Sequence, residues 1–196
     1  MKWFHKKAAC ESALPVLSTE RLVLRAFEPS DAVSVYAYAQ SEKVAQMAGF
    51  APHKSLEESR EMVVSFMEKR SHWAIVEKAT GHLIGSIHLQ MDYMRPHVEN
   101  ALRMGYMLSE NCWGQGYATE ACREMLRYAF EEQSCPVVSA DLFPQNTKSR
   151  RVLKKLGFAA DGILRHARLL PDGTPTDLVN YSLLRAEYES QKSKTK

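Results

Sequence analysis

The sequence predicts an α+β domain with a central mixed sheet of about seven strands and helices on its faces. Strand patterns separated by short turns occur near the beginning and at the end of the chain, and a long helical pattern joins two strand patterns in the middle. Hairpins give antiparallel pairs and a strand–helix–strand crossover gives a parallel pair, so a sheet holding both is mixed. The 196 residues fit one domain, which we place at residues 17–188.

The composition is that of an ordinary globular protein, with 45% hydrophobic residues, 25% charged residues and a formal net charge of +3. No apolar stretch has the length of a transmembrane helix, and no apolar segment of a secretory signal follows the first lysines. Lysines gather in a loose tail over residues 1–16 and in a basic tail over residues 189–196, a pattern more typical of solvated ends than of nucleic-acid binding. We expect a cytoplasmic protein that binds neither membranes nor nucleic acids.

The cysteines and histidines predict no metal site. Cys10, Cys112, Cys122 and Cys135 lack metal-ligand spacing, and the histidines form no helical pair. Reduced thiols of the cytosol are the expected state, and no histidine stands near Cys112 in the sequence to activate it as a nucleophile.

The first half of the chain alternates between strand and helix patterns. Residues 21–27 form the first predicted strand, and Pro29-Ser30-Asp31 begins a helix that runs to about Gln40. A capping box at Ser55–Glu58 begins a second helix. Residues 73–76 and 83–89 are strands around a Thr80-Gly81 turn, which makes the first hairpin.

The second half contains the crossover and a second hairpin. A strand at about residues 100–108 leads into a long amphipathic helix, which is followed by a strand at residues 137–142. A short helix then ends at Gly157. Residues 163–170 and 178–184 flank Pro171-Asp172-Gly173 as the final hairpin.

The stretch Trp113-Gly114-Gln115-Gly116-Tyr117-Ala118-Thr119-Glu120-Ala121 lies where the predicted strand meets the long helix. Glycines permit a tight turn and a close approach of a ligand to the backbone, and the first turn of a helix offers unpaired N–H groups to an anion. The segment is therefore either a phosphate-binding loop or a simple glycine-rich turn. No Gly-Lys-Ser/Thr ends it as in a P-loop, and the third small residue and the acidic residue of a dinucleotide fold are absent.

Three segments in the right order resemble the GNAT superfamily of acyl-CoA N-acyltransferases, in its RimJ/RimL-like branch. The glycine stretch is similar to that family's motif A, with Gly116 and Ala118 at two of the marked positions and Trp113 in place of Arg or Gln. Residues 146–158 resemble its Asn-x-x-Ser…Gly-Phe segment, and residues 17–25 resemble its opening strand. The resemblance spans about residues 17–188.

The resemblance implies a GNAT fold in which two neighbouring strands splay apart and acetyl-CoA enters the gap. It implies an N-acetyltransferase that moves the acetyl group to a primary amine by direct attack in a ternary complex. A homodimer is consistent with it. The cofactor-binding residues it implies are Tyr106, Met107, Leu108, Gly114, Gln115, Gly116, Tyr117, Ala118, Thr119, Asn146 and Ser149.

Ser149 is the catalytic residue that the resemblance implies, as the donor of a hydrogen bond to the departing thiolate. Asn146 would contact the pantetheine arm. From the residues alone, Asn at a helix N-cap with Ser three places later is also a capping signal, so Ser149 has a structural alternative.

The general base is not identified by the resemblance, because Arg103 and Arg168 occupy the two places where relatives carry acids. Replacements that the sequence offers are Asp92, Glu99, Glu110, His88 and His166, each of which is also an ordinary surface residue in pattern. An α-amine titrates near pH 8 and needs less help than a lysine near 10.4, which favours a protein N-terminus as acceptor.

Two further hypotheses concern the acceptor. Tyr36, Tyr38, Met47 and Phe50 are candidates for an acceptor cleft, although their spacing favours core positions, and Trp73 and Trp113 are predicted to be packing residues. The alternatives to N-terminal acetylation are a small-molecule amine acetyltransferase, acting on an antibiotic, a polyamine or an amino acid, and an inactive CoA-binding regulatory protein.

Overall fold

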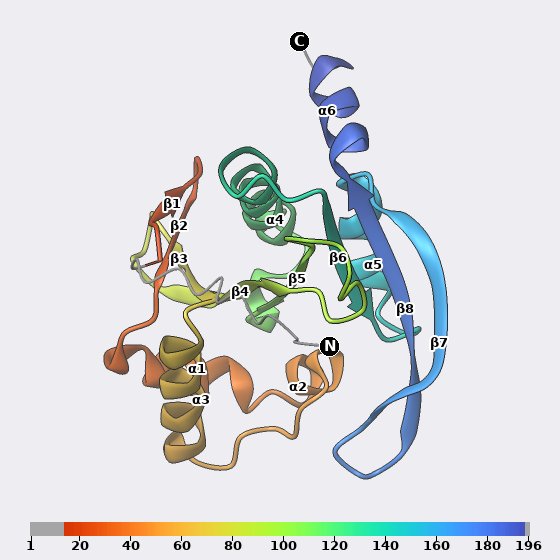
Figure 1. Cartoon of the computed structure of the whole chain (residues 1–196). Helices are drawn as coiled ribbons and strands as arrows, with labels where there is room; N and C mark the ends of the chain where they lie inside the picture. Colours follow the sequence, from red (N-terminus) through yellow and green to blue (C-terminus); the bar gives the residue numbers. More distant parts are fainter. Residues whose placement is uncertain (1–13, 195–196) are drawn as a thin grey trace, which may run out of the picture.

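The computed structural model describes residues 14–194, and within them the chain forms a mixed sheet of eight strands (Figure 1). Their order across the sheet is β1-β2-β3-β4-β5-β6-β8-β7, and β5 and β6 are the parallel pair. The predicted α+β class is confirmed, with one strand more than expected. The strands are β1 (Leu17–Ser18), β2 (Leu22–Ala26), β3 (His72–Glu77), β4 (Leu83–Met91), β5 (Leu102–Leu108), β6 (Val137–Leu142), β7 (Ala159–Leu169) and β8 (Pro175–Leu184).

Helices cover both faces of this sheet. One face carries α4 and the other carries α1 and α3, and two separate hydrophobic clusters fill these layers (Figure 1). The α-helices of the described chain are α1 (Ala32–Ala39), α2 (Glu42–Ala48), α3 (Leu56–Lys69), α4 (Tyr117–Arg127), α5 (Thr147–Lys155) and α6 (Arg185–Lys194).

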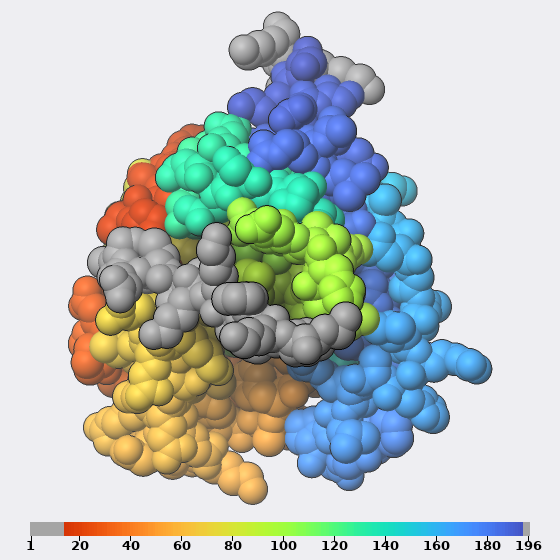
Figure 2. All heavy atoms as spheres, viewed as in Figure 1, coloured from red at the N-terminus to blue at the C-terminus, as the bar shows by residue number. Residues whose placement is uncertain are grey.

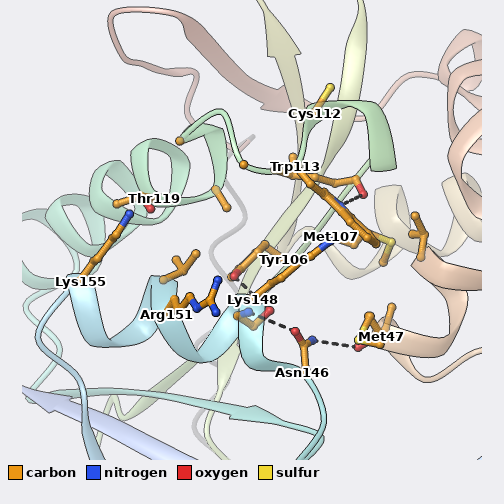
Figure 3. Close-up of a pocket in the computed structure, with 18 residues that line it drawn as sticks. Met47, Tyr106, Met107, Cys112, Trp113, Thr119, Asn146, Lys148, Arg151 and Lys155 are labelled. Carbon is orange, nitrogen blue, oxygen red and sulfur yellow. Dashed lines mark hydrogen bonds between the residues drawn. The ribbon is translucent and has the colours of Figure 1, made fainter.

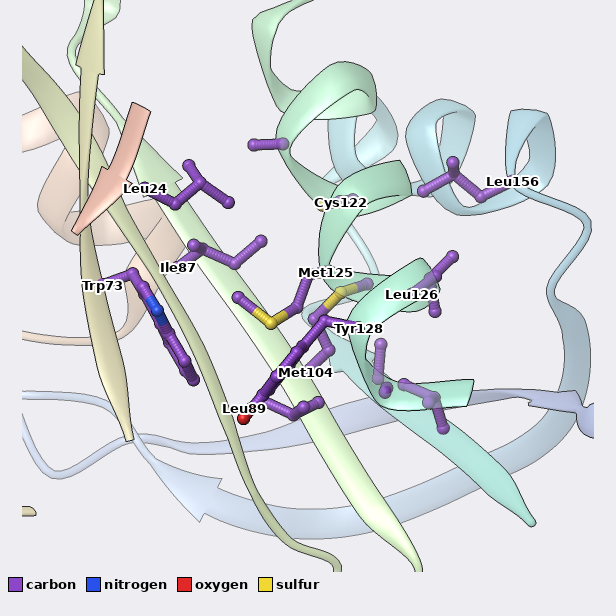
Figure 4. Packing of buried hydrophobic residues seen from close by; sticks show 14 of the residues in the cluster. Leu24, Trp73, Ile87, Leu89, Met104, Cys122, Met125, Leu126, Tyr128 and Leu156 are labelled. Atoms are coloured by element: carbon purple, nitrogen blue, oxygen red, sulfur yellow. The ribbon is translucent and has the colours of Figure 1, made fainter. Parts of the chain in front are cut away.

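The larger cluster lies between α4 and the sheet (Figure 4). Trp73 and Ile87 of the sheet face Met125 of the helix there, and Trp73 is 2% exposed, as its predicted packing role requires. Side chains alternate along a strand, so Ala74 contributes to the cluster on the opposite face. Burying this apolar surface on both faces holds the sheet rigid around the site.

β5 and β6 part soon after they begin to pair. Their register contains two residue pairs, Leu102 with Val138 and Arg103 with Ser139. β6 pairs along its whole length with β8 instead, from Val137 with Leu184 to Leu142 with Val179. The gap between the C-terminal ends of β5 and β6 is therefore built into the strand pairing.

Several predicted boundaries change in the structure. The predicted basic tail at 189–196 is helical as far as Lys194, because α6 includes it. The additional strand, β1, has two residues and is too short for a periodic pattern. α2 was not predicted, and it occupies about half of the link between the two predicted early helices. Most of the predicted N-terminal tail, with Cys10, lies outside the described residues.

Candidate active site

A cavity of about 470 Å³ opens where β5 and β6 part (Figure 3). Its walls are the end of β5, the glycine-rich loop, the first turn of α4, α5, and Val44, Met47 and Ala48 of α2. Most of the predicted binding residues line it together, although they come from separate segments. They are Tyr106, Met107, Leu108, Gly114, Gly116, Ala118, Thr119, Asn146 and Ser149.

The glycine-rich loop has the conformation that its glycines predict. Gly114 and Gly116 have φ values of 79° and 86°, in the left-handed region that favours glycine. Gly116 is the N-cap of α4, so the amides of the first turn of that helix face the cavity side. A helix terminus of this kind attracts anions.

Arg21 of the β1–β2 link fixes this loop from outside the cavity. Its Nη1 donates to the carbonyl oxygen of Gln115 at 3.1 Å, and its Nε donates to Glu120 at 2.7 Å. The guanidinium also lies 4.4 Å from the ring centre of Tyr117. Gln115 and Tyr117 are thus held against Arg21, and their side chains are not in the cavity wall, which leaves their backbone amides for the predicted cofactor role.

The position of Ser149 is compatible with both roles that the sequence left open, helix capping and a hydrogen bond to the departing thiolate. Oδ1 of Asn146 accepts a hydrogen bond from the Ser149 amide at 3.1 Å, so Asn146 does cap α5. The Tyr106 hydroxyl donates to Oγ of Ser149 at 3.1 Å (Figure 3). Burial raises the pKa of Tyr106, which keeps that hydroxyl protonated. The sequence indicated Tyr106 for its backbone alone and missed this side-chain pair.

The cavity has an excess of positive charge that the sequence analysis missed. Lys148, Arg151 and Lys155 line it from one face of α5, and no acidic residue is among the lining residues that the structure describes. Within residues 14–194 none of the three forms an ion pair. The signal was present in the sequence, as basic residues at i, i+3 and i+7 after Asn146.

Trp113 is part of the cavity wall as well as a packing residue. Its Nε1 donates to the Leu108 carbonyl oxygen at 2.9 Å, and Nζ of Lys148 lies 3.9 Å from its ring centre. A cation over an indole ring is a favourable contact. This indole therefore joins β5, the loop and α5 around the opening.

The replacement general bases lie outside this cavity. Glu110 pairs with Lys43 at 2.5 Å, and that hydrogen bond lowers its pKa, while Asp92 pairs with Arg95 at 2.7 Å. Glu99 and His166 are exposed on the surface. None of these is placed against the cavity, so each remains an unsupported candidate.

His88 of β4 pairs with Gly105 of β5, and it is held neutral. Burial lowers its pKa to about 3, and its Nε2 is buried without a hydrogen-bond partner among the described residues. Its ring covers Gly105 of β5, where a Cβ atom would lie 2.4 Å from Cε1 of His88. Gly105 is therefore required by the imidazole beside it.

The predicted acceptor-cleft residues separate in the structure. Met47 lines the cavity, whereas Tyr38 is a core residue that is 2% exposed. Figure 2 shows the β7–β8 hairpin and the α2–α3 segment at one edge of the molecule, and a Cβ at Gly49 would lie 3.7 Å from Nη1 of Arg168. Arg168 therefore reaches the end of α2 from the hairpin.

The residues around the cavity do not favour a nucleophilic thiol or a metal site. Cys112 lines it, but burial raises the pKa of this thiol, so the protonated form prevails. Among residues 14–194 no three His, Cys, Asp or Glu side chains are grouped as a metal site would need. In the same residues no helix is both long enough and apolar enough to cross a membrane.

The sheet order, the strand gap and the lined cavity agree with the family comparisons. Residues 21–159 match the model of the acetyltransferase (GNAT) domain family. The chain belongs to this family, and it is an N-acetyltransferase of the GNAT type. The predicted resemblance and enzyme class are confirmed.

Individual relatives support the same assignment. The N-acetyltransferase YoaA of Bacillus subtilis is 30% identical over 176 residues, which cover 87% of this chain and 97% of YoaA. YdaF of the same organism, named provisionally as a ribosomal N-acetyltransferase, is 37% identical over 112 residues, 57% of this chain and 59% of YdaF. A GNAT-family acetyltransferase structure from Bacillus anthracis superposes with a TM-score of 0.78 at 24% identity, covering 88% of this chain and 100% of the other.

Proposed function

We propose that acetyl-CoA binds in the cavity between β5 and α5, with its pyrophosphate on the amides of residues 114–119 and its pantetheine arm along residues 106–108. The observation that supports this most directly is the charge of the wall. Lys148, Arg151 and Lys155 face the positive end of α4 across a cavity without a lining carboxylate. A ligand that carries several phosphates neutralises both walls at once.

In this proposal the acceptor amine attacks the thioester carbonyl directly. The new C–N bond forms, and the C–S bond breaks with its electron pair on the CoA sulfur. The proton that the nitrogen loses reaches that sulfur through solvent, so the products are the amide and the CoA thiol. Ser149 donates a hydrogen bond to that sulfur while the Tyr106 hydroxyl donates to Ser149, which strengthens the serine as a donor. A preorganised hydroxyl pair stabilises the charge that develops on the leaving group.

For the acceptor we propose a protein N-terminal α-amine, with a small-molecule amine as the alternative. An α-amine is about one-tenth neutral at pH 7, so it depends little on a strong general base. Within residues 14–194 no carboxylate lines the cofactor cavity to act as that base. The name of YdaF, which refers to ribosomal acetylation, supports the same acceptor class.

Thiol release tests this function. Wild-type protein is incubated with acetyl-CoA and a panel of N-terminal peptides, polyamines, aminoglycosides and amino acids, and free CoA is measured with a thiol reagent. We expect the fastest release with a peptide that has a free N-terminus, and no release with its N-acetylated form. Binding of acetyl-CoA without release for any amine would contradict the acceptor proposal, and absence of acetyl-CoA binding would contradict the cavity assignment.

A further inference from the structure

A second cavity, of about 390 Å³, lies on the sheet face that points away from α4. Arg103 of β5 and Ser139 and Asp141 of β6 form its floor. Their neighbours in the two strands, Met104 and Ala140, belong to the hydrophobic cluster under α4, so the floor residues face the opposite side. Its rim comes from Met94 and Arg95 on one side and from residues 161–164 of β7 on the other.

Asp141 is the carboxylate of this cavity that retains an unused oxygen. Its side chain is 10% exposed, and Nε and Nη2 of Arg103 both bind its Oδ1. Within the described residues Oδ2 of Asp141 accepts no hydrogen bond. Asp161 differs, because Arg95 binds its Oδ2 at 2.7 Å and the Ser182 hydroxyl binds its Oδ1 at 2.6 Å.

Ser139 adds an independent indication of a ligand. This residue is 6% exposed and lines the cavity, and its hydroxyl has no hydrogen-bond partner in the part of the chain that the structure describes. Buried hydroxyls are normally hydrogen-bonded, and leaving one unpaired costs free energy. Its oxygen is covered in this structure, so a rotation of the side chain towards the cavity would let a polar ligand satisfy it.

The cavity is well placed for the acceptor of the proposed reaction. Arg103 and Ser139 form the second of the two parallel residue pairs, and Gly105 and Asp141 each follow that pair by two residues, where the strands part. Gly105 directly precedes Tyr106, the residue whose hydroxyl reaches Ser149 in the first cavity. The two cavities therefore approach the strand gap from opposite faces of the sheet.

We propose that the second cavity binds the acceptor. Its amino group arrives as ammonium on Oδ2 of Asp141 and loses one proton to solvent before it attacks, and a neighbouring carbonyl group accepts a hydrogen bond from the Ser139 hydroxyl. This inference rests on the proposed transfer from acetyl-CoA. Arg103 is a positioning residue, since it holds the carboxylate through Oδ1 and leaves Oδ2 towards the cavity.

The charge around the cavity selects the class of amine. Arg95 and Arg103 are balanced by three carboxylates, those of Asp92, Asp141 and Asp161, which leaves one negative charge in excess. A single ammonium group neutralises that excess. A polyamine or an aminoglycoside would bring several positive charges beside two guanidinium groups, which costs interaction energy. The site accordingly fits a primary amine with one positive charge.

The test compares Asp141→Asn with Asp161→Asn, a change of the same chemistry in the same cavity. Steady-state thiol release is measured with the peptide amide Ala-Ala-Ala-NH2 and with spermidine, acetyl-CoA affinity is measured by calorimetry, and folding is measured by thermal melting. For Asp141→Asn we expect the KM for the peptide amide to rise roughly 10-fold or more, because one charge-assisted hydrogen bond is lost. The affinity for acetyl-CoA should be unchanged. For Asp161→Asn we expect a change under about 3-fold, because both its oxygens already have protein partners.

Several results would overturn the proposal. One is a folded Asp141→Asn protein with wild-type KM for the peptide amide, and another is a higher kcat/KM for spermidine than for the peptide in the wild type. If Asp141→Asn does not fold, the double variant Arg103→Gln/Asp141→Asn removes both charges and must show the same rise in KM. If the wild type binds acetyl-CoA but acetylates no amine, the transferase proposal fails. Calorimetry of the peptide amide with CoA present then tests whether the second cavity binds the amine. Loss of peptide binding in Asp141→Asn supports that role, and binding equal to the wild type overturns it.

Discussion

The two cavities beside the β5–β6 gap arrange their charges in opposite ways. In the first, Lys148, Arg151 and Lys155 lie on α5, and the described part of the chain places no carboxylate in the wall. In the second, Arg95 binds two aspartates and Arg103 binds one, which leaves one carboxylate in excess. The first arrangement suits a ligand with several negative charges, and the second suits a ligand with one positive charge.

Burial explains why each arrangement is stable without a ligand. The three cations of the first cavity are exposed on α5, so water solvates them and leaving them unpaired costs little. Arg103 and Asp141 are 24% and 10% exposed, and charges that are this far from water need a partner. The unpaired cations are therefore the feature that distinguishes the proposed phosphate-binding wall from the ion-paired wall of the second cavity.

Of the changes to the first cavity, Gly116→Glu should have the largest effect on acetyl-CoA affinity. The new carboxylate would stand at the N-terminus of α4, where the proposed pyrophosphate lies, and would repel it. Losing two charge-assisted hydrogen bonds corresponds to a loss of roughly 100-fold or more in acetyl-CoA affinity. Calorimetry measures this change in acetyl-CoA affinity.

Gly173→Glu is the matched control for that change. Gly173 has a φ of 84°, close to the 86° of Gly116, and lies in the β7–β8 turn, where a Cβ atom would have no neighbouring atom within 4 Å. It carries the same left-handed strain far from the cavity. Unchanged acetyl-CoA affinity in a folded Gly116→Glu protein would show that the glycine-rich loop does not bind acetyl-CoA.

Ser149→Ala tests whether the hydroxyl pair belongs to the chemistry of the first cavity. We expect kcat to fall about 10- to 100-fold with acetyl-CoA affinity nearly unchanged, because the hydrogen bond acts on the departing sulfur. Tyr106→Phe should give a smaller fall in kcat, since it acts through Ser149. Thr147→Ala, in the same exposed turn of α5, is the control. Wild-type kcat with a lowered melting temperature would make Ser149 a purely structural residue.

Replacing the cations of α5 tests the charge of the first cavity through the salt dependence of acetyl-CoA binding. Arg151→Gln and Lys155→Gln should each weaken acetyl-CoA binding by about 3- to 10-fold at low salt, with a smaller difference at high salt where charges are screened. Lys154→Gln is the control, because Lys154 is exposed on α5 and does not line the cavity. Equal losses in all three variants would assign the effect to the general charge of the helix.

The face with the second cavity also contains buried histidines, and these predict a smaller effect of pH on stability. The rings of His72 and His88 lie 5.0 Å apart, and burial lowers their pKa values to about 4 and about 3. Below about pH 6.5 the unfolded chain binds protons that the folded protein does not. The free energy of unfolding should therefore fall as pH drops from 6.5 towards 4, by up to about 1.4 kcal/mol per pH unit for each histidine.

Urea unfolding between pH 7 and 4.5 measures this slope. His72→Gln should make it shallower, although the variant loses the contact of His72 with the Phe66 ring. His82→Gln, at an exposed position, should leave the slope as it is in the wild type. A wild-type slope in His72→Gln would show that other groups set the acid sensitivity.

Local patterns in the sequence were sufficient for the loop and for the capped start of α5. The two glycines predicted a tight turn before a helix, and Asn146 with Ser149 predicted a cap, because these conformations depend on neighbouring residues alone. The order of strands and helices followed from the same periodicities. α2 is seven residues long, and a pattern of that length is too short to predict.

The sequence by itself determined the fold class, the family and the residues that form the glycine-rich loop. The tertiary structure decided which distant residues meet: Tyr106 with Ser149, Arg103 with Asp141, and Arg21 with Gln115. These contacts depend on where β5 and β6 part and on how α5 returns to the gap. Strand register and helix packing set both, and they arise from the whole hydrophobic core, so no local pattern of residues encodes them.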